Sequence, residues 1–374
     1  MGDYISYTDY TYYYENENST ENGSSVYDIG STLDCPDSRL RGANIFLPVL
    51  YYLIFFTGFL GNLFVILVVG SKGRKSGRLV DTFVVNLALA DLIFVLTLPL
   101  WAISASQDGY WNFGSAGDVL CKLSSYIIAV NRFSNIFFLT CMSIDRYLAI
   151  VKLMDSRYLR SSRCMHATCA AVWVTSLLLG IPSLVYRRVE SLDQGQSCVE
   201  DNSSTFFFGM SLTMAFLTFV FPVLIIVLCY GTIIMHLNKH CIAAGNPRAE
   251  ARRRHSLKMV LCIIVAFVVS WLPFNIFKAI IIVSQLSKAD LSCDTWKRNG
   301  LLISCCLAFF NSCVNPAIYF FLDHHFRRQA EIMVKTCLGK PHLLHSHNSS
   351  ASFTNAGTSE SFATSGRTQL QMLK

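Results

Sequence analysis

Long apolar stretches alternate with short polar ones along most of the chain. Seven of these stretches are long enough to cross a bilayer, because about 20 residues of helix span its hydrocarbon core. They lie at residues 45–69, 80–104, 121–151, 165–186, 206–237, 257–284 and 300–322. A helix satisfies its own backbone hydrogen bonds in lipid. The pattern therefore predicts an all-α membrane protein with a seven-transmembrane helix bundle over residues 45–322.

The third apolar stretch, residues 121–151, organises this predicted bundle. As a helix it would be about 46 Å long, so both of its ends would reach water. Asn131, Arg132 and Asn135 lie in its middle, where hydrocarbon makes polar groups costly. Such residues must face protein or trapped water, and an ionisable group at that depth indicates a functional site.

The remaining segments differ in character from the seven stretches. Residues 1–44 are acidic and rich in tyrosine, which predicts a disordered tail. Residues 323–338 predict a short amphipathic eighth helix on the membrane surface, in contact with lipid, with Cys337 as a palmitoylation site. Residues 339–374 are rich in Ser and Thr and predict a second disordered tail, suited to kinases.

Composition and charge place the chain in a membrane and orient it. The chain is 52% hydrophobic and only 15% charged, and its net charge of +7 is segregated along the sequence, so it does not indicate nucleic-acid binding. Lys and Arg gather in the first, third and fifth connections, and residues 102–120 contain none. The positive-inside rule then predicts a multi-pass plasma-membrane protein with its N-terminus outside and its C-terminus in the cytoplasm. Glycosylation sequons at Asn18, Asn22 and Asn202 fall on the predicted outer face.

Cysteine positions agree with this topology. Of 14 cysteines, the ones predicted outside are Cys35, Cys121, Cys198 and Cys293. Disulfides persist in an oxidising exterior, and four cysteines allow three pairings, among which spacing alone does not choose. The spacing of Cys and His residues predicts no zinc-type metal site.

The apolar stretches carry short motifs, one per stretch in order along the chain. These motifs are Asn62, Leu87 with Asp91, Asp145-Arg146-Tyr147, Trp173, Pro222 with Tyr230, Phe267 to Pro273, and Asn315-Pro316 with Tyr319. The set resembles that of class A (rhodopsin-like) G-protein-coupled receptors, which have one such motif per helix in this order. Residues 97–101, residues 111–114 and the extra pair Cys35 and Cys293 are similar to the chemokine and related peptide receptors.

That resemblance implies two disulfides and an ion site. Cys121 would pair with Cys198, and Cys35 with Cys293, stiffening the ligand entrance. The family also implies an allosteric sodium ion among buried oxygen atoms, and no other cofactor. Its residues here would be Asp91, Asn131, Asn135, Asn311 and Asn315. Asn135 departs from the family, which more often has serine there, and a purely hydrogen-bonded core is the alternative.

The resemblance also implies a switch that couples ligand binding to a heterotrimeric G protein. In the resting receptor Arg146 would pair with Asp145, and on activation it would turn toward Tyr230 and Tyr319 as the sixth helix moves outward. The coupling residues would be Asp145, Arg146, Tyr147, Tyr230, Phe267, Trp271, Pro273, Asn315, Pro316 and Tyr319. Such coupling is a population shift between two packings of the bundle.

Ligand class follows from which residues are present. The seventh stretch has no lysine for a retinal Schiff base, and Ile128 stands where amine receptors carry aspartate. Basic residues beneath an acidic tail suggest a basic peptide or chemokine-like protein whose terminal carboxylate meets Arg132, since a guanidinium binds carboxylates in two-point geometry. Internal pairing of Arg132 with Asp91 or the asparagines is the alternative. The candidate ligand residues are Arg132, Ile128, Trp101, Tyr51, Lys278, Arg187 and Trp111.

Two other classes of function stay open on sequence alone. An atypical scavenger receptor would bind the same ligand without signalling. An intact Asp145-Arg146-Tyr147 favours G-protein coupling instead. The resemblance implies a G protein of the inhibitory class. A transporter or channel would show repeats or broken helices in matching halves, and the sequence has neither. An enzyme is not predicted.

Overall fold

A computed structural model describes residue 40 and residues 42–71, 79–152, 161–192, 195–201, 205–240, 247–287 and 295–338. The predicted acidic and Ser/Thr-rich tails lie outside these residues almost entirely, as do Cys35, Cys293, Asn18, Asn22 and Asn202.

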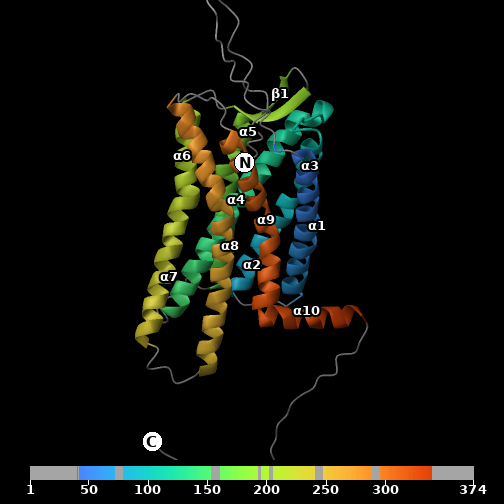
Figure 1. The fold of residues 1–374 in the computed structure, drawn as a ribbon. Helices are drawn as coiled ribbons and strands as arrows, with labels where there is room; N and C mark the ends of the chain where they lie inside the picture. The colour runs from blue at the N-terminus through green and yellow to red at the C-terminus, as the bar shows by residue number, and fades with distance from the viewer. Residues whose placement is uncertain are drawn as a thin grey trace, which may run out of the picture.

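Seven helical spans form the bundle, as the apolar pattern predicts, and they run side by side in Figure 1. Four are single helices: α1 (Ala43–Gly70), α5 (Ser162–Tyr186), α8 (Pro247–Leu286) and α9 (Thr295–Leu322). The second span joins α2 (Leu79–Val95) to α3 (Leu98–Ser106), and the third joins the short η1 (Gly114–Ala116) to α4 (Gly117–Ile150). The fifth consists of α6 (Thr205–Ala215), the π-helix η2 (Phe216–Val220) and α7 (Phe221–His240).

The surface and the interior of the bundle have the polarity that lipid requires. Large apolar side chains point outward, and Ile45, Leu228 and Phe321 each expose about 70% of their area. Polar side chains point inward, and Asn62 and Asp91 are completely buried. Lipid cannot hydrogen-bond, so only apolar groups can face it cheaply. This arrangement makes the chain a multi-pass membrane protein.

The third span is the centre of the packing, as its sequence predicts. In its most apolar window 72% of the residues are buried, against 22% in the fourth and fifth spans. α4 contacts α2, α5, α7 and α8. Gly180 of α5 allows a close approach to α4, because a Cβ there would lie 2.8 Å from the ring of Tyr126 on α4. Polar residues of α4 can therefore reach most of the bundle.

Prolines affect the helices unequally. A turn at Thr97 separates α2 from α3 just before Pro99, and the π-helix ends at Val220, two residues before Pro222. Pro182, Pro273 and Pro316 instead lie inside continuous helices. Helix irregularities next to a proline thus occur in the second and fifth spans.

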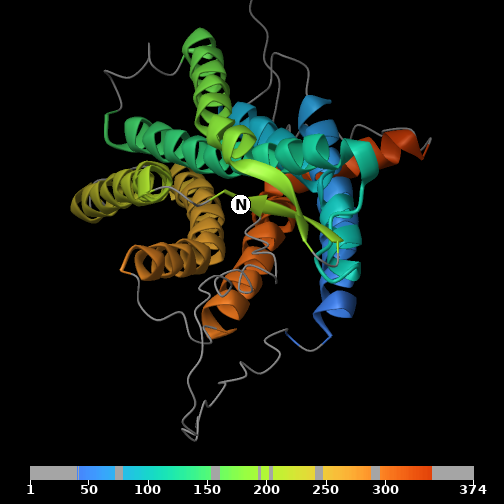
Figure 2. The same cartoon turned by 90° about the horizontal axis from the view of Figure 1, so that it is seen from above.

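The all-α prediction omits one element, a β-hairpin between the fourth and fifth spans. β1 (Arg187–Leu192) pairs antiparallel with β2 (Gly195–Glu200), so that Arg187 lies opposite Glu200 and Val189 opposite Cys198. Figure 2 shows the hairpin lying across one end of the bundle. We call this the hairpin end and the opposite one the α10 end.

The predicted eighth helix is α10 (His324–Cys337), which lies across the α10 end in Figure 1. The carboxylate of Asp323 begins it by accepting hydrogen bonds from the backbone N–H groups of His325 and Phe326. Such a cap satisfies donors that a helix start leaves open. Phe326 is buried against the rings of Phe64 and Tyr319, which fixes α10 to the bundle.

Candidate functional site

The first polar cluster lies in the middle of the bundle around Asp91 of α2. One carboxylate oxygen accepts hydrogen bonds from Asn131 (2.9 Å), Asn135 (2.8 Å) and Ser312 (3.0 Å), and the other accepts one from Asn315 (2.9 Å). A buried charge is costly unless hydrogen bonds replace its water. Asp91 thereby links α2 to α4 and α9. Ser312 was missed at the sequence level, although it lies one helical turn before Asn315.

The predicted sodium site can be tested against this donor set. Three of the four side-chain donors share one carboxylate oxygen of Asp91, and only Asn315 donates to the other oxygen, which keeps an acceptor position. The amide oxygens of Asn135, Asn311 and Asn315 have no hydrogen-bond partner among the described residues, and the nitrogens of Asn135 and Asn315 point at Asp91. Oxygen atoms of this kind are the ligands that a hard cation prefers. The hydrogen bonds hold Asp91 without an ion, and the sodium site stays a prediction.

The second cluster lines a pocket toward the hairpin end. The pocket opens to solvent and has a cavity volume of about 70 Å³. Its walls come from α4, α5, α6, α8 and β2, and its charged lining residues are Arg132, Lys278 and Glu200. Apolar side chains such as Phe207, Met210 and Ile282 complete it. An apolar cavity with a few charged groups is the usual form of a ligand site.

Arg132 connects this pocket to the packing below it. Its guanidinium carbon lies 4.7 Å from the ring centre of Phe133, 5.9 Å from that of Phe274 and 6.0 Å from that of Trp271. Aromatic faces attract a cation at these distances. Arg132 therefore borders both the pocket and Trp271, which is itself buried next to Phe267, their ring centres 6.0 Å apart.

Of the predicted ligand residues, only Arg132 and Lys278 line this pocket. Ile128 and Tyr51 are buried in the apolar core, and Trp101 and Trp111 pack on each other with ring centres 4.9 Å apart. Arg187 is fully buried and lies 3.9 Å from Glu200. These five residues pack within the protein around the pocket and do not form its surface.

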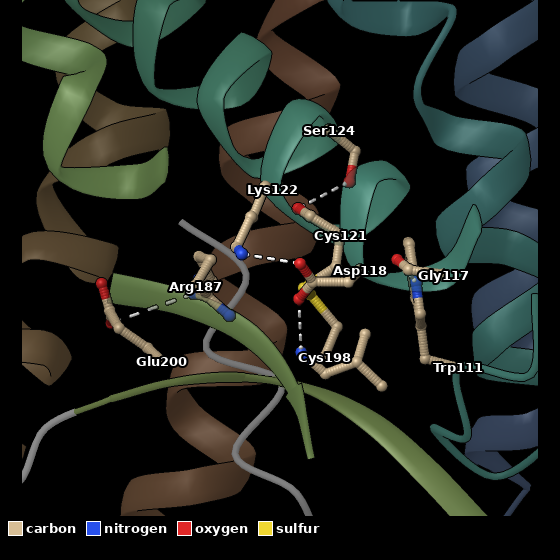
Figure 3. Close-up of a disulfide and its surroundings, with 10 residues drawn as sticks. Trp111, Gly117, Asp118, Cys121, Lys122, Ser124, Arg187, Cys198 and Glu200 are labelled. Atoms are coloured by element: carbon tan, nitrogen blue, oxygen red, sulfur yellow. Dashed lines mark hydrogen bonds and ion pairs between the residues drawn. A yellow bond between two sulfur atoms is a disulfide. The ribbon is translucent and has the colours of Figure 1, made fainter. Parts of the chain in front are cut away.

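A disulfide fixes the hairpin above the pocket. Cys121 at the start of α4 is bonded to Cys198 of β2, as the family resemblance implies (Figure 3). Asp118 adds two contacts, since its carboxylate accepts hydrogen bonds from the backbone N–H of Val189 (3.2 Å) and from Lys122 (2.6 Å). Both strands are thus held to one turn of α4.

Trp111 stabilises the start of α4 from the side. Its indole N–H donates a hydrogen bond to the backbone oxygen of Gly117 at 2.8 Å (Figure 3). Its backbone N–H donates a hydrogen bond to the backbone oxygen of Gln196 in β2. Buried indoles usually find such a partner. A residue predicted to touch ligand therefore anchors the hairpin.

The predicted switch includes Asp145, Arg146 and Tyr147, which lie in the last two turns of α4, at the end opposite Cys121. Arg146 donates a 2.6 Å hydrogen bond to the neighbouring Asp145, which is buried. Tyr147 is partly buried beside them. Tyr230 of α7 and Tyr319 of α9 are buried, and neither hydroxyl has a hydrogen-bond partner among the described residues. Two buried polar groups are thus available to a new partner.

The model of the 7 transmembrane receptor (rhodopsin family) matches residues 61–319. The chain belongs to this family. Receptors of this family are signalling proteins and not enzymes, which also removes the transporter or channel alternative.

Curated relatives cover most of the receptor's length. It is 40% identical to the probable G-protein coupled receptor 25 of Mus musculus over 300 residues, which are 79% of this chain and 80% of the relative. It is 37% identical to G-protein coupled receptor 15 of the same species, over 80% of this chain and 82% of the relative. It is 36% identical to apelin receptor A of Danio rerio, over 88% of this chain and 92% of the relative.

Proposed function

We propose that this receptor binds a basic peptide or a chemokine-like protein at the cell surface and activates a heterotrimeric G protein of the inhibitory class. Membership of the rhodopsin family and similarity to an apelin receptor support a peptide ligand. The hairpin end is extracellular in this proposal, because the basic connections between spans lie at the other end. A disulfide on the hairpin agrees with that orientation, since disulfides persist in an oxidising exterior.

The position of Arg132 carries the ligand proposal. Arg132 lines the pocket about 16 Å along α4 from Cys121, the disulfide residue. A carboxylate at the end of an extended ligand can reach that depth, where the guanidinium offers it two hydrogen bonds. The body of the ligand stays outside, where its basic residues meet the acidic residues of the N-terminal tail.

Activation then passes from Arg132 to the α10 end. An anion bound at Arg132 weakens the attraction of the guanidinium for the rings of Phe133, Phe274 and Trp271. Trp271 and Pro273 lie on α8, the helix whose outward motion opens the G-protein cleft in this proposal. Arg146 then leaves Asp145 for the buried hydroxyls of Tyr230 and Tyr319. Arrestin and receptor kinases act on the C-terminal tail.

The test begins with a screen of secreted basic peptides on transfected cells, read by inhibition of cyclic AMP formation and by arrestin recruitment. Ligand binding without either response would favour the scavenger function. With an agonist in hand, Arg132→Ala should lower its potency about a hundredfold, since a charge-assisted pair contributes up to about 3 kcal/mol. Arg132→Lys keeps the charge but loses the two-point geometry, so its potency should fall less.

Amidating the C-terminus of the agonist gives an independent control. The amide should lose potency on the wild-type receptor and lose little more on Arg132→Ala, because the partner of the carboxylate is already missing there. Unchanged potency in both Arg132 variants, with normal surface expression, would refute the role of Arg132.

A further inference from the structure

Glu200, the last residue of β2, places a carboxylate in the wall of the pocket. A single oxygen of this carboxylate lies 3.3 Å from the ammonium nitrogen of Lys278 on α8 and 3.9 Å from the guanidinium of Arg187. Figure 3 shows Glu200 and Arg187 facing each other across the end of the hairpin. One acidic group therefore stands between a cation of the hairpin and a cation of a transmembrane helix.

The two contacts of Glu200 differ in how easily they open. Arg187 has no exposed surface and lies opposite Glu200 in the hairpin, so this contact moves with the hairpin as a unit. Lys278 and Glu200 keep 20% and 17% of their side-chain area exposed, and their 3.3 Å distance exceeds that of a strong charge-assisted hydrogen bond. The Lys278 contact is therefore the one that an incoming group can replace.

The charge of the pocket determines what that group is. Arg132 and Lys278 carry positive charge, and Glu200 is the one acidic residue among the described residues of the lining. An anion entering the pocket meets both cations and competes with Glu200 for Lys278. A cation would be repelled by both.

The Glu200–Lys278 contact also joins parts of the fold that the disulfide leaves separate. Cys198, two residues before Glu200, ties β2 to α4, whereas Lys278 belongs to α8, seven residues beyond Trp271. We propose that Glu200 and Lys278 form a latch that holds the hairpin to α8, and that an anionic ligand group opens it by taking Lys278 from Glu200. The signalling consequence of the latch rests on the proposed function, but its existence does not.

Hydrogen exchange in the full-length receptor in lipid nanodiscs tests the latch without a ligand. Glu200→Gln and Lys278→Gln should each raise exchange of the β2 backbone amides about three- to fivefold, the factor expected from losing a partly exposed ion pair. Lys278→Arg keeps the cation and should stay near wild type. Asp201→Asn is the matched control, since it removes the neighbouring carboxylate, which pairs instead with the exposed Arg188 at 3.0 Å.

Benzoate, an apolar anion, probes the opening step, and benzamide is its neutral counterpart. Benzoate at millimolar concentration should raise β2 exchange in the wild-type receptor, and benzamide should not. Neither should change exchange in Lys278→Gln, where the latch is already open. The latch is wrong if Glu200→Gln and Lys278→Gln exchange like wild type, or if benzamide acts as benzoate does.

Basal inhibition of cyclic AMP formation separates the latch from the proposed function. If the latch restrains α8, both Gln variants should raise basal signalling while Asp201→Asn does not. Faster exchange in the Gln variants, with no signalling from any receptor variant, would support the latch and refute G-protein coupling. Faster exchange with signalling that stays at the wild-type level would refute the restraint on α8.

Discussion

Asp91 and Glu200 are acidic residues of the same bundle with opposite surroundings. Asp91 is completely buried and accepts four hydrogen bonds of 2.8–3.0 Å from neutral side chains. Glu200 is partly exposed, and cations at 3.3 Å and 3.9 Å share one of its oxygens. The first carboxylate is held by four short hydrogen bonds that no solvent screens. The second is held by longer contacts that an ion from solution can replace.

The comparison shows how one membrane protein can use charge in two ways. Around Asp91 of α2 the donors come from two other helices, so any change there disturbs α2, α4 and α9 together. Around Glu200 the partners belong to a hairpin and one helix, so a change there frees one contact. We expect substitutions in the first cluster to act on stability, and substitutions in the second on ligand response.

Removing the buried carboxylate should have the largest effect. Asp91→Ala leaves four buried donors without an acceptor, and each such group costs about 1–3 kcal/mol, so we expect a loss of about 4 kcal/mol in stability. Asp91→Asn keeps the shape and one acceptor oxygen and should lose about half as much. Thermal unfolding of the purified receptor in nanodiscs measures both. Equal stability of the two variants would mean that the hydrogen bonds to Asp91 do not stabilise the bundle.

Removing the disulfide should act on the hairpin and spare the core. The Cys121–Cys198 bond closes a loop of 77 residues, but the bundle already orders most of that loop. Replacing both cysteines by serine should therefore cost about 2 kcal/mol, less than the loop-closure entropy of an unstructured chain of this length would give. Hydrogen exchange should rise in β2 and stay unchanged in α2 around Asp91. Equal increases in both regions would show that the two clusters are not independent.

Much of the fold could be predicted from hydropathy because lipid leaves few alternatives. A chain that cannot hydrogen-bond to its surroundings must form helices, so seven apolar stretches gave seven spans. The hairpin lies outside that constraint. Residues 187–200 form a short polar segment, and the pairing of its two strands depends on the disulfide and on Asp118 of a distant helix.

The site was predicted less completely, for two physical reasons. Sequence identified Asp91 and its asparagines but not which amide atom faces the carboxylate, because packing decides that orientation. Aromatic residues near a mouth, such as Trp101 and Trp111, have the same pattern whether they bind ligand or stabilise a loop. Glu200 was missed because only the strand register brings it opposite Arg187 and into the pocket.

Sodium dependence provides the third test. Asn135→Ser shortens a donor that reaches Asp91 and removes one of its four hydrogen bonds. We expect this variant to lose about 1 kcal/mol and, when sodium chloride replaces choline chloride, to be stabilised more than the wild-type receptor is. Equal stabilisation of both receptors by sodium would show that the hydrogen bond from Asn135 does not compete with a cation.

The smallest effect is expected at the rim of the hairpin, where charge is present but screened. Arg188 lies 3.0 Å from Asp201 and 3.5 Å from Glu190, so by distance it is as well paired as Lys278. Its side chain is 51% exposed, however, and exposed ion pairs contribute about 0.5 kcal/mol or less. Arg188→Gln should therefore leave the unfolding midpoint, β2 exchange and basal signalling near wild type. If it matched Lys278→Gln in all three measurements, total charge on the hairpin, and not the contact between Glu200 and α8, would control this end of the receptor.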